Sequence, residues 1–320
     1  MSLSLEFLDR CASESGFRVA ALEKVSLLGE LAGDIMRHPF LGKALALKGG
    51  SALNLCFCPP ERLSVDLDFN YIAHAEREKM LEERPLIEGA LIELANRQKF
   101  RVQKSAEAFA GRKFYLHYRS VLGSEDRIEV DLNFIFRVPL SGLESCELWQ
   151  PGDLDRPVVR MVGQDELFIG KMLAFLDRGA ARDVWDIAHL PEQASRRLAA
   201  SRFRKLFIAL SVTLDHSISK YSRDRLERLV TNRVIMEQVA PLLNVEIEPR
   251  AVDLIEKAWA VVGEFFDLSA EEKDYLESAS HGDLRTELLF PSDVQEARRI
   301  AAHPAIQWKI NNVIAHTAKS

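Results

Sequence analysis

Two segments of the chain, residues 65–72 and 127–136, alternate between apolar and polar side chains. Residues two apart on a β-strand point to the same side, so this alternation is typical of strands with one buried and one polar face. The polar positions are mostly carboxylates: Asp66, Asp68 and Asn70 in the first segment, and Glu129, Asp131 and Asn133 in the second. We therefore expect a sheet that carries acidic groups on one face.

The remaining patterns predict a mixed α/β part followed by helices, an α/β (α+β) fold class. The predicted strands, residues 44–47, 65–72, 113–120 and 127–136, all precede residue 140, whereas helical spacing dominates after it. Helices are also predicted over residues 21–36 and 75–97, the second with a break or kink at Pro85. We expect an α/β domain over residues 1–155 and an all-helical domain over residues 156–320.

Composition excludes several classes of protein. The chain has 320 residues, of which 47% are hydrophobic and 28% charged, so a globular core is expected rather than disorder. A formal net charge of -6 argues against a protein that coats DNA non-specifically, although local basic patches matter more than the total. No segment has the length of apolar sequence that a membrane helix requires, so no membrane partner is expected.

The cysteines and the N-terminal residues favour the cytoplasm. Cys11, Cys56, Cys58 and Cys146 are too sparse for a disulfide framework and lack a second pair for a zinc site, so reduced thiols are expected. The first residues also lack the basic start and apolar run of a signal peptide.

Asp66 and Asp68 are the most specific candidates for chemistry. Two carboxylates held close together on one strand face repel each other, and a divalent cation removes that repulsion. Mg²⁺ is typically held by one or two carboxylates together with substrate phosphates. The alternative for an isolated Asp-x-Asp is the solvated polar face of an edge strand.

Gly49-Gly50-Ser51 favours the metal-site interpretation. Glycines between a strand and a helix let backbone N–H groups approach a phosphate, and the helix N-terminus favours negative charge. The Ser51 hydroxyl is available to the same anion. The order strand, Gly-Gly-Ser, short helix and Asp-x-Asp strand therefore predicts a phosphate-binding turn beside a metal site.

The second acidic strand supplies a third carboxylate. Three acids around one or two metal ions fit a two-metal scheme for in-line phosphoryl or nucleotidyl displacement. Asp131 and Glu129 share the polar face, and spacing alone leaves both open.

A second charged motif lies between residues 171 and 186. Lys171 and Arg178 are seven residues apart, and Asp183 and Asp186 are three apart, so each pair can share a helix face. Lys171 is expected to hold a triphosphate as a point charge. The alternative is a charged helix surface in which Arg182 pairs with Asp186.

Together these motifs resemble the AbiEii/AbiGii toxin family of nucleotidyltransferases. The first family motif matches Gly49-Gly50-Ser51 followed by Arg62-Leu-Ser64-Val-Asp66-Leu-Asp68, and the second resembles Val130-Asp131-Leu-Asn133. The second match is the reason for preferring Asp131 to Glu129. The third motif matches at Lys171, Ala174, Arg178, Arg182, Asp183 and Asp186. The similarity covers about residues 45–190.

The resemblance implies a polymerase-β-like fold, dependence on Mg²⁺ (or Mn²⁺), and a nucleoside triphosphate substrate. It implies metal ligands at Asp66, Asp68 and Asp131, with Lys171 also catalytic. The nucleotide-binding set it implies is Gly49, Gly50, Ser51, Arg62, Ser64, Lys171, Arg182, Asp183 and Asp186. It further implies a toxin of a type IV toxin–antitoxin or abortive-infection system, a cognate antitoxin, and an RNA acceptor such as tRNA.

Two other functions stay open at this point. The same core can nucleotidylate a protein or a small molecule, and a catalytically silent nucleotide-binding module can act through a partner. For an RNA acceptor, two arginine-rich segments of the helical part, residues 196–205 and 223–233, are the candidate binding stripes.

Overall fold

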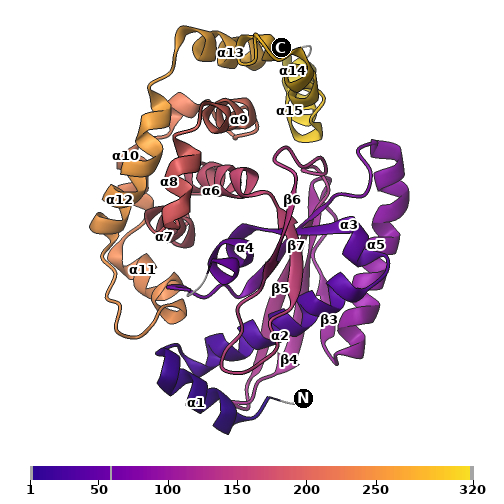
Figure 1. Ribbon diagram of the computed structural model, residues 1–320, viewed down its shortest axis with the longest axis vertical. Coiled ribbons are helices and arrows are strands. Elements are labelled where there is room, and N and C mark those ends of the chain that lie inside the picture. The colour runs from indigo at the N-terminus through magenta and orange to yellow at the C-terminus, as the bar shows by residue number, and fades with distance from the viewer. Residues whose placement is uncertain (1–2, 58–59, 318–320) are drawn as a thin grey trace. The chain divides into compact units, whose positions relative to one another are not determined.

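The computed structural model describes residues 3–57 and 60–317. Their contacts divide the chain into two compact units. The first comprises the chain up to Leu167 together with Met236–Glu248, and the second comprises Phe168–Ile235 and the chain from Pro249 onward. Figure 1 labels their helices and strands. The predicted fold class, a mixed sheet with helices followed by a helical part, is confirmed.

Within the described residues, seven strands of the first unit form a mixed sheet in the order β3-β4-β5-β2-β1-β7-β6. The pairs β2–β5 and β1–β7 are parallel, and the other neighbours are antiparallel. The strands are β1 (Leu45–Lys48), β2 (Asp66–Tyr71), β3 (Arg101–Lys104), β4 (Gly111–Arg119), β5 (Glu125–Asn133), β6 (Leu143–Glu147) and β7 (Val158–Val162).

Strands β1, β2, β4 and β5 lie close to the predicted segments, of which β2 and β5 were predicted from alternation, whereas β3, β6 and β7 were not predicted. The strands β6 and β7 correct the expectation of almost only helices after residue 140. Both edge strands, β3 and β6, consist mainly of exposed or half-buried residues, so neither shows a clear apolar face. The inner strand β7 does not alternate in sequence, because Val158 is exposed and its neighbour Val159 is buried, yet both are apolar.

One face of the sheet is apolar and covered by helices. Leu67, Phe69, Leu116 and Val130 are completely buried on it. The helices α2 and α5 contact each other, α2 contacts β2 and β7, and α5 contacts β3 (Figure 1). The helices of the first unit up to residue 97 are α1 (Leu5–Ser15), α2 (Val19–Arg37), α3 (Leu41–Ala44), α4 (Gly49–Cys56) and α5 (Arg77–Arg97). Pro85 does not break α5.

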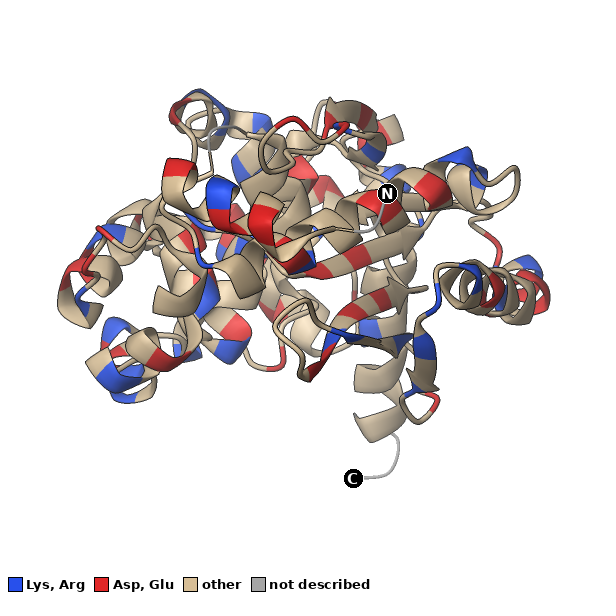
Figure 2. Ribbon diagram, turned by 90° about the horizontal axis from the view of Figure 1, so that it is seen from below, with Lys and Arg blue, Asp and Glu red and all other residues tan. Residues whose placement is uncertain are grey.

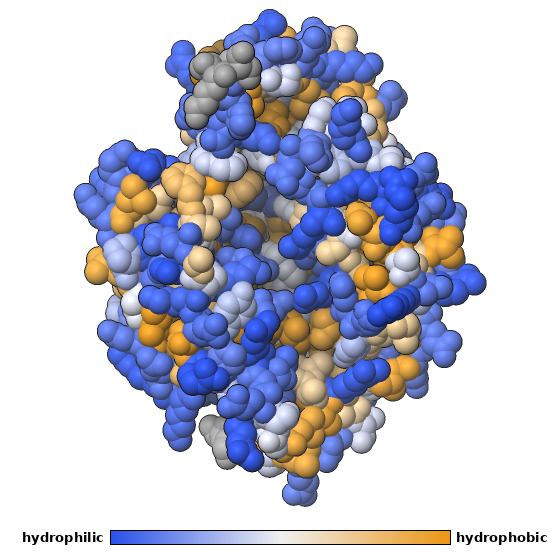
Figure 3. All heavy atoms as spheres, turned by 180° about the vertical axis from the view of Figure 1, so that it is seen from behind, coloured by the Kyte–Doolittle hydropathy of each residue, from blue (hydrophilic) through white to orange (hydrophobic). Residues whose placement is uncertain are grey.

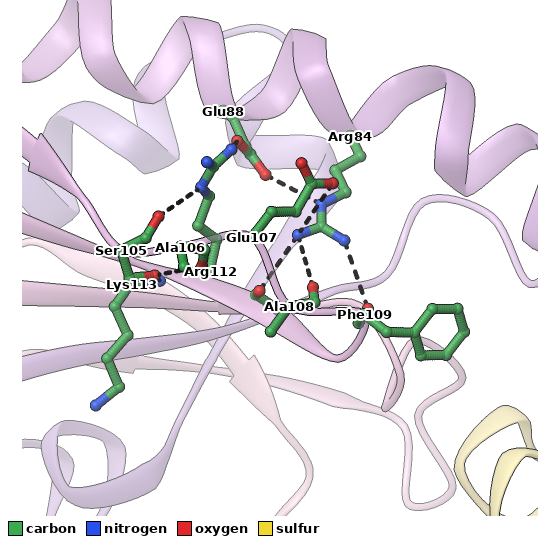
Figure 4. Close-up of polar contacts among 10 residues, drawn as sticks. Arg84, Glu88, Ser105, Ala106, Glu107, Ala108, Phe109, Arg112 and Lys113 are labelled. Carbon is green, nitrogen blue, oxygen red and sulfur yellow. Dashed lines mark hydrogen bonds and ion pairs between the residues drawn. The ribbon is translucent and has the colours of Figure 1, made fainter. Parts of the chain in front are cut away.

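A buried charged network ties α5 to the loop between β3 and β4 (Figure 4). Arg84, which is 5% exposed, donates to Glu88 at 3.0 Å and to the backbone oxygens of Ala108 and Gly111 at 3.0 and 3.2 Å. Glu88 in turn accepts from Arg112 at 2.8 Å. The Arg112 side chain therefore lies on the α5 side of the sheet, and neighbouring Lys113 points away from it in Figure 4.

The second unit is helical. The division between the units falls within α6 and α11. From residue 164 on, the α-helices are α6 (Gln164–Arg178), α7 (Ala181–Ala188), α8 (Glu192–Leu198), α9 (Ser201–Ser211), α10 (Arg223–Leu229), α11 (Asn232–Gln238), α12 (Ala251–Gly263), α13 (Ala270–Ser280), α14 (Val294–Ala301) and α15 (Pro304–Thr317).

The core of the second unit is aromatic and aliphatic. Phe207 contacts Phe265 edge-to-face at 4.8 Å between ring centroids, and Phe203 contacts the same ring at 6.0 Å. The helix α12 packs against α7 and α10. The Tyr275 hydroxyl donates to the backbone oxygen of Ala209 at 3.1 Å, which satisfies a polar group that is completely buried.

The cysteines differ from the expectation of reduced thiols. Cys56, the last residue of α4, forms a disulfide with Cys146 of β6, across 90 residues of sequence. Sequence spacing gave no sign of this pairing, because it depends on α4 and β6 meeting in the fold. Cys11 is a free, buried cysteine, and burial raises the pKa of its thiol. Cys58 lies outside the described residues.

The described surface is mainly polar. Hydrophilic side chains predominate on the face drawn in Figure 3, where apolar side chains form separated patches. Acidic and basic residues are interleaved along the helices in Figure 2. Within the described part of the chain, none of the helices has the length and apolar character needed to cross a membrane.

The Arg84 network predicts a large difference between two arginines of α5. Replacing Arg84 by Ala removes one of the cations that bind the buried Glu88 carboxylate. It also removes the donor to the backbone oxygens of three residues next to it, Ala108, Phe109 and Gly111. The free energy of unfolding should therefore fall by about 3–5 kcal/mol. Arg97→Ala, which removes a 74% exposed side chain from the same helix, should change it by less than about 0.5 kcal/mol. Urea denaturation measures both, and equal losses would contradict the structural role of Arg84.

Candidate functional site

The turn from β1 into α4 places backbone against the Asp68 carboxylate. Gly49, the first residue of α4, has φ of +73°, a conformation that favours glycine. A Cβ at this position would lie 2.2 Å from Oδ2 of Asp68. Lys48, the N-cap residue, makes no side-chain hydrogen bond to the helix. The N-terminus of α4 therefore lies directly beside the Asp68 carboxylate.

Strand register aligns four charged residues across the sheet. Lys48 of β1 pairs with Asp68 of β2, Asp68 pairs with Asp131 of β5, and Asp131 pairs with Lys113 of β4. Paired residues on neighbouring strands point to the same face. We call Lys48, Asp68, Asp131 and Lys113 the charged row. Its two carboxylates lie between two lysines.

A second row lies next to the first on the same face. Asp66 of β2 pairs with Glu129 of β5, so Asp66 and Asp68 fall on one side of β2 as expected for residues two apart. Glu129 is also an ion-pair partner of Lys113, at 3.8 Å, and of Arg127, at 3.1 Å. The face therefore carries two carboxylates from each of two adjacent parallel strands.

The electrostatics centre on Asp131. Burial raises the pKa of Asp131, Lys48 opposes that shift, and Asp68 adds to it by repulsion. Lys113 also lowers the pKa, with its Nζ 3.9 Å from Oδ2 of Asp131. The two lysines thus help to keep a partly buried acid in its charged form, as expected for opposite charges nearby.

The residues fit a magnesium ion that is bound together with a triphosphate. Within the described residues, no group of three or more His, Cys, Asp and Glu side chains is close enough to hold a metal ion. Mg²⁺ usually needs only one or two carboxylates, because phosphates and water supply its other ligands. Asp68 and Asp131 provide such a pair, and buried Asn70 adds an oxygen without a hydrogen-bond partner two residues beyond Asp68.

Three other residues of the first motif are buried in the fold. The Ser51 hydroxyl donates to the backbone oxygen of Asp66, which fixes α4 to β2. Arg62, 1% exposed, donates to the backbone oxygen of Leu63 at 2.9 Å, and Ser64 is 4% exposed. The Ser51 contact therefore has a structural part in holding α4 against β2.

Lys171, Asp183 and Asp186 form a charged cluster in the second unit. Lys171, on α6 and 6% exposed, donates to Asp186 at 2.7 Å and lies 3.5 Å from Asp183. Both aspartates lie on α7 and are 1% exposed. Arg178 contacts Asp183 with two nitrogens, Nε at 2.5 Å and a terminal nitrogen at 3.0 Å. The alternative of a solvated charged surface does not describe these buried aspartates.

The arginine-rich segments are largely engaged within the second unit. Arg204 binds Glu272 at 2.7 Å and two backbone oxygens, and Arg225 donates to the backbone oxygens of Leu176 and Asp177. Further ion pairs join Arg202 to Glu296 and Arg223 to Glu227. Four of the arginines proposed for an RNA stripe therefore have intramolecular partners.

The structure brings Gly49, Asp66, Asp68 and Asp131 together, and it adds two lysines that the sequence did not single out. Lys48 directly precedes the Gly-Gly-Ser motif in the sequence. Its pairing with Asp68, however, depends on the register of β1 and β2. Lys113 is 18 residues from Asp131 in sequence and opposes it only through the β4–β5 ladder. Sequence spacing contains no signal for that contact.

Gly49→Ala tests the close approach of the turn to Asp68. The substitution should displace the Asp68 carboxylate and abolish triphosphate binding, because a Cβ has no room there. Gly123→Ala is the matched control, since Gly123 also has a positive φ, +87°, but has no atom within 4 Å of an added Cβ. Both variants should lose about 1 kcal/mol of stability from backbone strain. Normal nucleotide binding by Gly49→Ala would contradict the site.

The charged cluster of the second unit generates a stability prediction. Lys171→Met removes the cation from two buried aspartates, so the free energy of unfolding should fall by about 3–5 kcal/mol. Arg178→Met affects a side chain that is 65% exposed and should cost much less, about 1 kcal/mol. Chemical denaturation distinguishes them. A Lys171→Met protein of normal stability would show that Lys171 does not hold the cluster.

Comparisons with known proteins identify the family. A family model described as nucleotidyl transferase AbiEii toxin, type IV toxin–antitoxin system, matches residues 33–244, more than half of the chain. Among solved structures, MenT4, a nucleotidyltransferase toxin from Mycobacterium tuberculosis H37Rv, aligns with a TM-score of 0.62 and 19% identity, over 94% of this chain and 99% of that one. At this identity the likeness shows a shared fold. No curated protein matches the chain. The chain belongs to the AbiEii family of nucleotidyltransferase toxins of type IV toxin–antitoxin systems.

Proposed function

We propose that this nucleotidyltransferase toxin moves a nucleoside monophosphate from an NTP to a hydroxyl of an RNA acceptor such as tRNA, and that it requires Mg²⁺ or Mn²⁺. The observation that carries the proposal is the charged row against Gly49. It combines a helix N-terminus that suits a phosphate with two carboxylates that suit a divalent ion. Family membership supports the transfer itself.

In the proposed mechanism each residue near Gly49 has a separate part. The backbone of Gly49 and Gly50 seats the triphosphate at the start of α4, and Lys48 balances its charge from the β1 side. Asp66 and Asp68 would hold a divalent metal ion, and Asp131, which pairs with Asp68 in the ladder, would complete its ligand set. When bound, the metal supplies Lewis-acid stabilisation of charge on the transferring and leaving phosphates.

The bond changes follow from this arrangement. The acceptor hydroxyl loses its proton, for which the Asp131 carboxylate is the nearest base in the proposal, and its oxygen attacks the α-phosphorus. The bond from that phosphorus to the bridging oxygen breaks, and pyrophosphate leaves. On the family motif we further propose that Lys171, Arg182, Asp183 and Asp186 of α6 and α7 bind nucleotide, and that Arg62, Ser51 and Ser64 hold the turn.

The proposed reaction also implies a cellular compartment and a protein partner. NTPs and RNA are substrates of the cytoplasm, so the reaction is assigned there. A toxin of this family implies a cognate antitoxin, which would protect the host from the transfer.

Removing the carboxylates tests the proposed metal site. In Asp68→Asn and Asp131→Asn, transfer of radiolabel from the four NTPs to total cellular RNA should fall about a thousandfold or more, because several kcal/mol of charge stabilisation are lost. Magnesium with a nonhydrolysable NTP should raise the melting temperature of the wild type but not of these variants. Without metal, the variants should be as stable as the wild type or slightly more so, since Asp68 no longer repels Asp131.

Glu125→Gln is the control, because Glu125 is an 80% exposed acid on the same strand as Asp131. It should retain both transfer and the thermal shift. Unchanged transfer by Asp68→Asn would refute the assigned site. Label that appears only in protein or in a small molecule would replace the RNA acceptor by that class, and label in no product would favour a silent nucleotide-binding module.

A further inference from the structure

The polar face of the sheet continues past the charged row onto β4 and β3. Lys113, Tyr115 and His117 alternate along β4 on the side opposite to completely buried Phe114 and Leu116. Register pairs Tyr115 with Gln103 and His117 with Arg101, so β3 extends the same face. We call Arg101, Gln103, Lys113, Tyr115, His117 and Arg127 the sheet platform.

The sheet platform is open, whereas the reverse face of β4 is covered. The side chains of Lys113, Arg127 and Arg101 are 50%, 52% and 64% exposed. The helix α5 lies on the other side, because Arg112 reaches Glu88 there while Lys113 points away (Figure 4). These platform side chains are therefore accessible to a ligand.

One aromatic ring of the platform has a guanidinium stacked on it. The Cζ atom of Arg127 lies 4.7 Å from the ring centroid of Tyr115, and Glu129 fixes the same arginine at 3.1 Å. A guanidinium held over an aromatic face is a favourable cation–π arrangement. The ring is thereby held in a set orientation beside Lys113, one step along the strand from the charged row.

The basic side chains of the platform are paired but remain at least half exposed. Arg101, Lys113 and Arg127 form ion pairs with three carboxylates, Glu125, Glu129 and Asp131, and each of the three cations keeps half or more of its side chain exposed. Proteins that bind single-stranded nucleic acid combine basic side chains for the backbone with aromatic rings on which bases stack. A β-sheet face that presents aromatic residues is an established form of such a surface, and Tyr115 is half-buried on this face.

We propose that the sheet platform receives the single-stranded end of the RNA acceptor, with Lys113 on a phosphate and Tyr115 stacked on a base. This inference rests on the proposed nucleotidyl transfer to RNA and adds where the acceptor lies. The position is continuous with the reaction site, because Lys113 opposes Asp131 directly in the β4–β5 ladder. The charged row then has two ends: Lys48 beside the triphosphate turn, and Lys113 beside the acceptor.

The role of Tyr115 predicts an order of RNA affinities. Fluorescence anisotropy is measured with a fluorescein-labelled, single-stranded RNA that has a free 3′-hydroxyl. Tyr115→Leu should weaken binding about tenfold, because stacking on an aromatic ring is lost. Tyr115→Phe should bind like the wild type, because the ring is kept. Equal binding by the Leu and Phe variants would overturn the stacking role.

The basic residues of the platform are tested by salt dependence. Lys113→Met should lower the slope of log affinity against log salt by about 0.7, as expected for one lost contact with a single-strand phosphate. Arg97→Gln is the matched control, since it removes an equally charged and 74% exposed side chain from α5, which covers the opposite face. An identical slope for Lys113→Met and the wild type, or an equal effect of Arg97→Gln, would overturn the platform.

Two further measurements separate this inference from the proposed function. Affinity for a fluorescent NTP analogue should be normal in Tyr115→Leu, which also verifies that this variant is folded. Loss of NTP binding in Tyr115→Leu would overturn an acceptor role. If the wild type labels RNA but the platform variants bind RNA normally, the platform is wrong and the transferase proposal stands. If the wild type labels only protein and binds no RNA, the platform and the RNA acceptor both fail.

Discussion

The contact between the Asp68 carboxylate and the backbone of Gly49 is the constraint on which the site depends. Only a residue without a Cβ leaves room for Oδ2 of Asp68, and the same residue needs the positive φ that starts α4 directly after β1. The β1–β2 ladder then sets Lys48 opposite Asp68, and the parallel β2–β5 ladder sets Asp131 beside it. A helix start that suits a phosphate and an acidic pair thus come from one turn and two strand registers.

The surrounding fold offsets the electrostatic repulsion between the carboxylates of the charged row. Two carboxylates on adjacent strands repel each other, and burial adds to the tendency of Asp131 to take up a proton. Lys48 and Lys113 offset part of that cost from either side. On the reverse face, buried Arg84 fastens the β3–β4 loop to α5, which keeps β4, and with it Lys113, in register with Asp131. Stability and site geometry therefore depend on the same strands.

Local features of the sequence were enough to predict the acidic strands, the glycine turn and the helical second part, because each has its own period or turn residue. The same reasoning missed β3 and β6, which are polar edge strands, and the Cys56–Cys146 disulfide, which joins elements 90 residues apart. It also missed Lys113, whose contact with Asp131 depends on strand register. For Lys171 it predicted a phosphate-binding point charge and did not foresee that two buried aspartates surround this lysine.

The most direct test of the central claim is anomalous diffraction from crystals of the protein with Mn²⁺ and a nonhydrolysable NTP analogue. We predict an anomalous peak between the carboxylates of Asp68 and Asp131, with the triphosphate at the N-terminus of α4. A manganese peak at another group of ligands, with Asp68 and Asp131 uncoordinated, would contradict the assignment of the charged row as the metal site.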